Sequence, residues 1–342
     1  MPKIQHFLID WFKKNQRQLP WRNSKSAYKI WLSEIILQQT QVVQGTQYYL
    51  KFCKAFPSVS ELADASENTV FKMWEGLGYY NRAKNLHFTA KTIKNDFNGV
   101  FPCKYDEILK LKGIGPYTAA AISSFAFNNP KPLVDGNVFR LYSRLFNIPT
   151  PINTSKGQKE FTFLAEKLLS ELNVKQGVVY NQAIMEYGAL VCTPKTPKCG
   201  ECGLQSKCLS FKNDSIKNRP IKLKSKPKRE RIFSYILFKQ DSKFWVEKRL
   251  EKDIWNKLYQ PFLIEGDLEQ ISTLDINKDN IQTISKTIKH VLSHQNLHIT
   301  FFSYELDLKE KFDFLSRGEW ITKKQFHEYP FPQVVSKFLT EI

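Results

Sequence analysis

Apolar residues recur with the period of an α-helix through the first half of the chain. One predicted helix face follows the i, i+3, i+4, i+7, i+8 spacing and consists of Tyr28, Trp31, Leu32, Ile35 and Ile36. The segments 161–172 and 179–190 have similar spacing, and short turns rich in Gly, Pro and Asn separate such segments. The pattern therefore predicts an all-α domain over residues 1–210.

The pattern changes near residue 231. The segments 232–238, 243–247 and 297–304 are rich in β-branched and aromatic residues, which predicts strands. The stretch 274–287, rich in Ser, Lys and Asn, predicts a loop followed by a helix. We therefore expect a second, smaller α+β domain at 231–342.

Residues 211–230 separate the two patterns. They include Lys-Asn-Arg-Pro and Lys-Ser-Lys-Pro-Lys-Arg-Glu-Arg, and the segment is too polar and too often interrupted by proline to pack in a core. The sequence thus predicts a multidomain chain in which a basic linker joins the two domains.

The net charge indicates a polyanionic partner. Lys and Arg number 51 against 33 Asp and Glu, a formal charge of +18. Binding nucleic acid would neutralise phosphates and release counterions, whereas a lysine-rich surface kept for solubility is the alternative. No apolar run reaches the roughly 18 residues of a membrane span. We expect a soluble, cytoplasmic monomer that binds DNA and no membrane.

Four of the six cysteines lie within 192–208. They are spaced C-x6-C-x2-C-x5-C, at Cys192, Cys199, Cys202 and Cys208. Four thiolates in one short segment can hold either tetrahedral zinc or an iron–sulfur cluster, and the spacing alone leaves both open. Cys53 and Cys103 are expected to be ordinary buried thiols.

A Gly-Ile-Gly turn joins two predicted helices near 105–127. Gly113 and Gly115 permit a tight turn with exposed backbone N–H groups, and the helix that begins at Pro116 can hold a phosphate by its dipole. This arrangement looks like a helix-hairpin-helix, with an ordinary corner between helices as the alternative. Further on, Asp135 precedes another predicted helix, where it could serve as an N-cap.

The hairpin, the aspartate and the cysteine spacing, in this order, resemble the endonuclease III superfamily of DNA glycosylases. The resemblance implies a structural [4Fe-4S] cluster on the four cysteines. It also implies that Asp135 is the essential carboxylate, which stabilises the positive charge that develops on the sugar as an N-glycosidic bond breaks. By the same resemblance, Asn137 orients the catalytic carboxylates.

The segment 31–41 carries a polar stripe on its predicted helix. The stripe consists of Glu34, Gln38 and Gln41, and a solvated helix face is the alternative interpretation. The segment closely resembles a helix of MutY-type adenine DNA glycosylases, as do 19–22 and 76–82. The resemblance implies that Glu34 protonates an extruded adenine at N7, because a carboxyl in a partly dry pocket keeps its proton near neutral pH.

The same resemblance assigns further residues. Tyr117 stands where bifunctional relatives carry a Schiff-base lysine, and since a phenol cannot form an imine, a monofunctional glycosylase is implied. Tyr79 resembles the wedge that stacks beside 8-oxoguanine once adenine has flipped out. The remaining candidates are Trp21 and Arg22 in the adenine pocket, Gln38 as part of the stripe that selects adenine, and Gln39 and Thr40 near the orphaned base.

The resemblance continues more thinly after the linker. The segment 247–255 looks like part of the Nudix-like recognition domain that such glycosylases append. No carboxylate box of a Nudix hydrolase follows Gly266, so this domain is not expected to hydrolyse nucleotides. The loop at Leu292 resembles the hairpin that inspects 8-oxoguanine, with Ser293 and His294 as hydrogen-bonding candidates, although the family usually has an aromatic residue at the leucine.

The chain is thus expected to release adenine opposite 8-oxoguanine or guanine in double-stranded DNA. Two rival hypotheses remain open. A mismatch thymine or uracil glycosylase of the same superfamily would do without a residue in the role of Glu34 and without the second domain. A non-catalytic DNA-binding protein would use the hairpin and the cluster to sense damage, which Glu34, Asp135 and Asn137 together argue against.

Overall fold

The computed structural model describes residues 3–224, 227–267, 276–277, 280–307, 310 and 312–342. Its contacts divide the chain into two compact units. The first unit comprises Met1–Asp64 and Asn85–Lys224, and the second comprises Ala65–Lys84 and Ser225–Ile342. The hydrophobic pattern does not predict that Ala65–Lys84 packs with the C-terminal part. The domain boundaries predicted from the sequence, at 1–210, 211–230 and 231–342, therefore stay a prediction.

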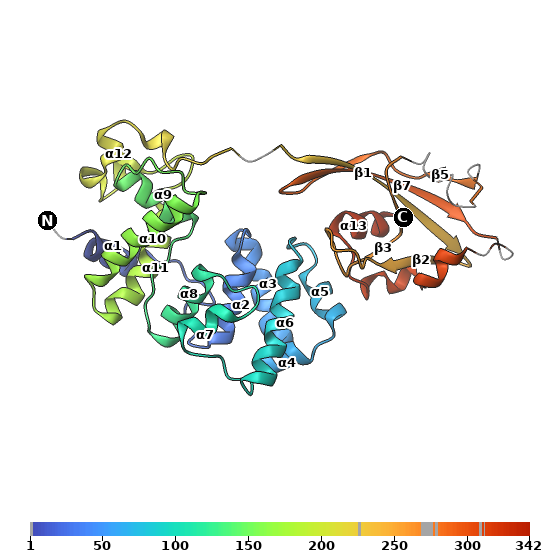
Figure 1. Ribbon diagram of the computed structural model, residues 1–342, viewed down its shortest axis with the longest axis horizontal. Helices are drawn as coiled ribbons and strands as arrows, with labels where there is room; N and C mark the ends of the chain where they lie inside the picture. Colours follow the sequence, from blue (N-terminus) through green and yellow to red (C-terminus); the bar gives the residue numbers. More distant parts are fainter. Residues whose placement is uncertain (1–2, 225–226, 268–275, 278–279, 308–309, 311) are drawn as a thin grey trace. The chain divides into compact units, whose positions relative to one another are not determined.

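The regular elements described in the first unit are all helices and 3-10 turns, as the apolar period predicts (Figure 1). None of the helices in the described part of the chain has the length and apolar character needed to cross a membrane. The helices of the first unit are α1 (Ile4–Asn15), α2 (Ala27–Leu37), α3 (Val42–Ala55), α4 (Val59–Asp64), α7 (Tyr105–Lys110), α8 (Pro116–Phe127), α9 (Gly136–Leu145), α10 (Ser155–Ser170), α11 (Val174–Leu190) and α12 (Leu209–Lys212), with 3-10 turns η1 (Cys199–Glu201), η2 (Gln205–Lys207) and η3 (Ile216–Asn218). Helix α6 (Asn81–Asp96) begins in the second unit and continues into the first.

Helices α1, α9, α10 and α11 enclose one core of the first unit. Phe161 and Tyr187 are among its fully buried side chains. The hydroxyls of Tyr142 and Tyr180 pair with each other at 3.0 Å, which satisfies two polar groups inside this core. Packing of α9 against α11 fixes the start of α9, where Asp135 lies.

The predicted helical hairpin is confirmed by α7, a short turn and α8. Gly113 has a φ of +79°, and a Cβ at this position would lie 2.6 Å from the Cβ of Asn85, so the turn requires glycine. Gly115 caps α8, and Pro116 occupies its first turn, where a missing N–H costs little. The free N–H groups of this helix start remain available for an anion.

The predicted linker is not free along its whole length, and the expectation that it is too polar to pack was wrong for its first part. The backbone N–H of Ile152 donates to Ile221 O at 3.0 Å, and Arg144 Nε donates to Arg219 O at 3.2 Å. Backbone hydrogen bonds, which the polarity of a segment does not exclude, hold it against the first unit.

The second unit is built on a mixed sheet (Figure 1). The two longest strands, β1 and β7, run parallel in the middle of the sheet, and β1 also pairs antiparallel with β2 and β4. The strands are β1 (Arg229–Gln240), β2 (Lys243–Lys248), β3 (Tyr259–Gln260), β4 (Phe262–Glu265), β5 (Gln282–Thr283), β6 (Ile288–Val291), β7 (Gln295–Glu305) and β8 (Glu319–Thr322). The strands predicted at 232–238, 243–247 and 297–304 are therefore confirmed.

Both faces of the sheet are covered by apolar side chains. On one face α13 (Gln333–Glu341) packs, and the ring of Phe338 stacks on Phe301 with centroids 3.8 Å apart. On the other face Phe238, Trp245 and Phe262 belong to a second core. A strand buried on both faces reads as a nearly continuous apolar run, which is the pattern of β1. Two 3-10 turns, η6 (Asp313–Arg317) and η7 (Lys323–His327), complete the described elements of this part.

The helix expected after the loop at 274–287 is wrong for the described residues. Strand β5 lies within this stretch and pairs with β7, and β6 follows directly. Pairing with β7 outweighs a weak local preference for helix.

The segment Ala65–Lys84 contains α5 (Glu67–Trp74) and the start of α6. Lys72 Nζ donates to Tyr329 O at 3.1 Å, and the Tyr80 hydroxyl donates to Phe331 O at 3.3 Å. These bonds join the segment to the residues that lead into α13.

Candidate active site

Glu34 lies on α2 and lines a pocket of the first unit. The pocket has a cavity volume of about 90 Å³, which is several times the ~10–15 Å³ that one water molecule needs. Its other lining residues are Trp21, Arg22, Ser24, Lys25, Ile30, Ser33, Phe125, Val178, Gln182 and Met185. Trp21 and Arg22 thus line the same pocket as Glu34, and their role toward adenine stays a prediction.

The environment of Glu34 favours its protonated form. Burial raises its pKa to about 7, hydrogen bonding with Tyr117 lowers it, and the negative charge of Asp135 raises it. Both the protonated and the ionised form of Glu34 are therefore accessible near neutral pH. A carboxyl of this kind can both give and take a proton under physiological conditions.

Tyr117 stands in the first turn of α8, facing the same carboxyl. Burial and the charges of Glu34 and Asp135 hold the pKa of its hydroxyl well above the usual value, so it stays a neutral phenol. The hydroxyl lies 3.4 Å from the sulfur of Met185. Beside it on α8, Thr118 accepts a hydrogen bond of 3.3 Å from Gln38, which ties the end of α2 to α8.

Asp135 is the N-cap of α9, as the sequence suggested. Its Oδ1 accepts from the backbone N–H of Asn137 at 2.9 Å and of Val138 at 2.8 Å, and its Oδ2 accepts from Asn137 Nδ2 at 2.7 Å. Burial raises the pKa of Asp135 above its ordinary value, although these hydrogen bonds and the charge of Arg140 oppose the rise. The cap therefore fixes a carboxylate in a partly dry place.

Arg140 orients the Asn137 amide. Its Nη2 donates to Asn137 Oδ1 at 2.9 Å and to Gly188 O at 2.6 Å, so the amide must turn its NH₂ group toward Asp135. A Cβ on Gly188 would lie 2.8 Å from the Asn137 carbonyl oxygen, which explains the glycine. Arg140 is not among the site residues predicted from the sequence, although its position three residues after Asn137 on a predicted helix was a usable signal.

A buried cluster of charges supports the wall of the pocket. Glu186 on α11 accepts from Arg17 Nη2 at 2.6 Å and from Arg22 Nη2 at 2.7 Å. Burial raises the pKa of Glu186, but the hydrogen bonds from the two arginines outweigh it and bring the pKa to about 2. Arg22 is thus bound by Glu186, and the neighbouring Trp21 ring packs edge-on against Tyr49. No local motif could have revealed a partner so distant in sequence.

The polar stripe predicted from Glu34 to Gln41 is wrong beyond its first residue. Helix α2 ends at Leu37, Gln38 is its C-cap, and Gln41 is the N-cap of α3. The intervening Gln39 is exposed and has a φ of +56°, a conformation that costs a residue other than glycine about 1–3 kcal/mol.

Gln39 and Thr40 therefore lie in a tight turn rather than on a helix surface. The Thr40 hydroxyl donates to Gln38 O at 3.3 Å. Hydroxyls that bond to the local backbone compete with helical bonds, which accounts for the early end of the helix.

Tyr79 lies in the second unit with 49% of its surface exposed. It has a φ of +49° in a turn that Arg82 closes, with bonds of 3.1 Å from Nη2 to Leu77 O and Gly78 O. The Arg82 guanidinium also lies 5.9 Å from the centre of the Tyr79 ring. The ring is thus held at the surface by a locked turn.

Ser293 and His294 form the exposed turn between β6 and β7. The Ser293 hydroxyl lies 3.2 Å from His294 Nδ1. Leu292 N donates to Gln295 O at 2.9 Å, which closes the hairpin below them.

The four clustered cysteines line one cavity of the first unit. They lie on the segment between the end of α11 and the start of α12. The Tyr187 hydroxyl lies 3.1 Å from Cys202 Sγ, and Arg144 Nη1 donates to Cys192 Sγ at 3.5 Å. Within the described ranges, no group of three or more Cys, His, Asp or Glu side chains is arranged to hold a single metal ion. Of the two other cysteines, Cys103 is exposed, which corrects the expectation that it is buried.

Two family models match the chain. The first, described as HhH-GPD superfamily base excision DNA repair protein, matches residues 32–169, and the second, described as NUDIX domain, matches residues 234–341. Together with the helices of the first unit and the sheet of the second, these matches confirm the predicted fold class.

Relatives of known name cover the whole length. The chain is 35% identical over 341 residues to an adenine DNA glycosylase of Buchnera aphidicola subsp. Schizaphis graminum, covering 98% of this chain and 97% of that relative. It is 34% identical to the adenine DNA glycosylase of Buchnera aphidicola subsp. Acyrthosiphon pisum, covering 98% and 96%. A solved structure of a thermostable thymine-DNA glycosylase is similar with a TM-score of 0.56 and 28% identity, covering 61% of this chain and 95% of that one.

The charge cluster around Glu186 should make stability depend on acid pH. The Glu186→Gln substitution removes the buried anion that pairs with two arginines, so we expect a loss of about 3–5 kcal/mol in the free energy of unfolding near neutral pH. Because the folded pKa of about 2 lies below the ordinary 4.5, this stabilisation is fully present above pH 4.5 and is lost as the pH falls toward 2.

Urea unfolding of both proteins at a series of pH values measures this difference. The control is Glu171→Gln, which removes an exposed carboxylate paired with Lys3 and should change stability little. A gap between wild type and Glu186→Gln that stays constant down to about pH 2 would contradict the assignment.

Proposed function

Because the chain belongs to the adenine DNA glycosylase family of the HhH-GPD superfamily, we propose that it hydrolyses the N-glycosidic bond of adenine opposite 8-oxoguanine or guanine in double-stranded DNA. One observation carries this proposal. An acid with a pKa near 7, Glu34, lines a pocket beside Asp135, a carboxylate bonded by three N–H groups. Departure of a neutral base from a sugar requires this pair of an acid and an anion.

Glu34 is proposed to start the reaction. The reacting bond is inaccessible inside a duplex, so adenine must first leave the base stack and enter the pocket. The Glu34 proton passes to N7, and the electrons of the bond between C1′ and N9 leave with the protonated base. General acid assistance of this kind contributes about 10²–10⁴-fold to a rate.

Asp135 is proposed to stabilise the positive charge left on the sugar. Its carboxylate cannot rotate, because both oxygens accept bonds from the start of α9 and from Asn137. Fixed charge of this kind needs no reorganisation while the sugar becomes cationic. The Glu34 carboxylate, now without its proton, accepts one from the water that attacks C1′ and is thereby restored.

Tyr117 supports a monofunctional reaction. It places a neutral phenol next to both carboxyls, and a phenol cannot form an imine with C1′. The sugar product is then an abasic site on an intact strand, and the hydroxyl of Tyr117 stabilises the intermediate by hydrogen bonding.

The residues around the mispair are proposed from their exposure. Tyr79 offers an exposed ring that can fill the space of the flipped base, with Gln39 and Thr40 near the orphaned base. Ser293 and His294 are exposed hydrogen-bonding groups that can read 8-oxoguanine. The hairpin of Gly113 and Gly115 can hold a DNA phosphate, and we propose that a single copy of the chain acts on its duplex.

We further propose that Cys192, Cys199, Cys202 and Cys208 hold a [4Fe-4S] cluster. The residues fit such a group, since four sulfurs line one cavity and two of them have neighbouring donors in Tyr187 and Arg144. When bound, the cluster ties the loop at 192–208 together. Arg140 connects this loop to the site, because its Nε donates to Cys192 O at 2.6 Å.

A thymine glycosylase is the rival function, favoured by the similar solved structure. That similarity covers 61% of the chain, whereas the relatives named adenine DNA glycosylase cover 98% of it. The protonated state of Glu34 also suits adenine, which is a poorer leaving group than a thymine anion.

Base release under single-turnover conditions tests the proposed function. The substrates are duplexes with adenine opposite 8-oxoguanine, adenine opposite guanine, adenine opposite thymine, and thymine opposite guanine. We expect the fastest release from the first, with strand breaks only after alkali is added. Glu34→Gln should bind the first duplex yet release adenine about 10²–10⁴-fold more slowly. Release of thymine would refute adenine specificity. Strand breaks without alkali would refute monofunctional chemistry.

The release rate should fall with rising pH. Only the protonated Glu34 can donate, and its pKa is about 7, so the single-turnover rate should be highest below pH 7 and fall about tenfold per unit well above it. Rates measured from about pH 6 to 9 on the first duplex check this. A flat profile over this range would exclude Glu34 as the acid.

Two substitutions separate the capping role of Asp135 from its charge. Asp135→Asn keeps the cap, because its Oδ1 can still accept from the backbone N–H groups of Asn137 and Val138, but its own NH₂ replaces the oxygen that accepts from Asn137 Nδ2. We expect this variant to lose about 1–3 kcal/mol of stability for that one bond, while the release rate falls at least 10²-fold. Asp135→Ala should lose the activity and, because the cap is lost as well, a further ~0.5–2 kcal/mol of stability. An Asp135→Asn protein with nearly full activity would leave the residue a cap and nothing more.

Iron and acid-labile sulfide analysis tests the cluster. We expect about four of each per purified chain, and Cys202→Ala should lower both together with the thermal unfolding temperature. Cys103→Ala, which changes an exposed cysteine outside the loop, is the matched control. One zinc per chain in place of iron would contradict the assignment.

A further inference from the structure

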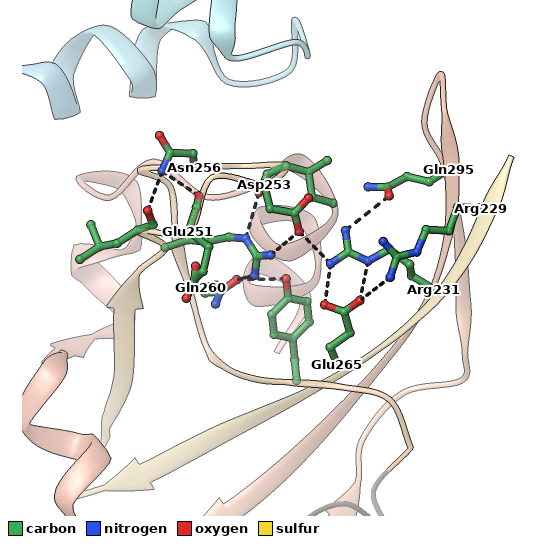
Figure 2. A network of polar contacts seen from close by, with 12 residues as sticks. Arg229, Arg231, Glu251, Asp253, Asn256, Gln260, Glu265 and Gln295 are labelled. Atoms are coloured by element: carbon green, nitrogen blue, oxygen red, sulfur yellow. Dashed lines mark hydrogen bonds and ion pairs between the residues drawn. The ribbon is translucent and has the colours of Figure 1, made fainter.

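The second unit contains a network of charges around two buried arginines that the proposed chemistry does not use (Figure 2). Arg231, at the start of β1, has a side chain only 5% exposed. It binds Glu265 through two bonds, of 2.7 Å from Nε and 2.6 Å from Nη2, and Asp253 through one of 2.7 Å. Arg249 donates to the same oxygen of Asp253 at 2.8 Å. Two arginines and two carboxylates thus converge at one point.

Such a network is a poor way to gain stability. Removing charges from water is expensive, and well-packed apolar side chains of the same volume often stabilise a protein as well or better. A guanidinium instead fixes the positions of its partners, because its five N–H donors lie in one plane. The partners of Arg231 belong to β4, to the hairpin at 292–295 and to the loop between β2 and β3.

One partner belongs to the hairpin at 292–295. Arg231 Nη1 donates to the side-chain oxygen of Gln295 at 3.4 Å, and Gln295 is buried at the first position of β7. Gln295 directly follows His294, whose carbonyl accepts from Arg229 N at 3.2 Å. The base of the exposed turn is therefore bonded to β1 by backbone and by side chain.

Another partner belongs to the loop that joins β2 and β3. Asp253 lies in this loop, and Arg249 at its start also donates to Ile254 O at 2.9 Å. The Asn256 amide donates to Leu250 O and to Glu251 O at 3.1 and 2.9 Å, so the loop is closed on itself (Figure 2). Its tip is consequently a rigid extension of the network.

The tip of this loop binds the segment that carries Tyr79. Lys257 Nζ pairs with Glu67 at 2.5 Å, at the start of α5, and Lys84 Nζ donates to Asn256 Oδ1 at 3.0 Å, in the first turns of α6. Glu67 and Lys84 thus flank Tyr79 on either side along the chain. A continuous set of bonds runs from the hairpin through Arg231 and Asp253 to this segment.

We propose that Arg231 is a positioning residue that holds the hairpin of Ser293 and His294 in register with the segment of Tyr79, and so sets the preference for the base opposite adenine. This inference rests on the proposed function, since both elements are there assigned to that base. Because its side chain is buried, Arg231 is proposed to act through its partners rather than by contact with DNA. Its effect should appear in the preference between opposite bases, because the carboxyls of the first unit are unchanged.

The test compares single-turnover adenine release from duplexes with 8-oxoguanine or guanine opposite adenine. Arg231→Lys keeps the charge but cannot bridge Glu265, Asp253 and Gln295 together. We expect the ratio of the two rates to fall about tenfold, the scale on which small misplacements act, through a slower reaction opposite 8-oxoguanine. Release opposite guanine should stay within about twofold of wild type.

Lys239→Met is the matched control. It removes an ion pair of 3.7 Å with Glu305 at the other end of the same two paired strands, away from the hairpin. This variant should keep the wild-type ratio. Thermal unfolding of every variant shows whether a loss of ratio follows a loss of stability, which a purely structural role of Arg231 would require.

A second variant keeps the test decisive if Arg231→Lys folds poorly. Lys257→Gln leaves the buried network intact and breaks only its bond to Glu67, and it should lower the ratio as well. In the double variant the two losses should not multiply, because both substitutions interrupt one chain of contacts. Multiplying losses, or an unchanged ratio in Lys257→Gln, would overturn the inference.

Failure of the proposed function gives a different result. If wild type releases no adenine from either duplex, the proposed function itself is refuted. If wild type releases adenine with a preference for 8-oxoguanine and the variants keep that preference, only the role of Arg231 is refuted.

Discussion

A carboxyl group that is taken out of water keeps its proton, and the first unit is organised around one such group. Glu34 reaches a pKa near 7 because α2 is packed on α8 and because a second carboxylate lies close by. The same packing keeps Tyr117 neutral. The charge cluster of Glu186 supports the wall of the pocket without placing a free charge in it, since its arginines are already bound.

Asp135 shows that a capping residue and a charged site residue need not be alternatives. The bonds that begin α9 are the bonds that fix its carboxylate, so local helix formation prepares the electrostatics directly. Asn137 joins the two roles, because its backbone N–H donates to one oxygen of Asp135 and its side-chain amide, oriented by Arg140, donates to the other. A helix start of this kind delivers a rigid anion from a few adjacent residues.

Short-range patterns in the sequence predicted much of this molecule. The hairpin around Gly113, the long strands and the helices were predicted from the spacing of apolar residues and glycines along the chain. What could not be predicted depends on partners far apart in sequence. Glu186 meets Arg17 across 169 residues, β7 draws the stretch near 282 into a sheet, and the backbone of the linker bonds to the first unit. The early end of α2 is the exception, since a local hydroxyl contributes to it.

Arg140 has one further consequence. A single guanidinium donates both to the amide that orients Asp135 and to the backbone of Cys192. Damage to the cysteine loop would therefore remove an acceptor of Arg140 and loosen the guanidinium that orients Asn137, even in molecules whose helices remain folded. Preparations of such a protein would contain a fraction of molecules that bind DNA without turning over. The protein concentration would then overstate the concentration of active enzyme, and the amplitude of the first turnover would measure the active fraction.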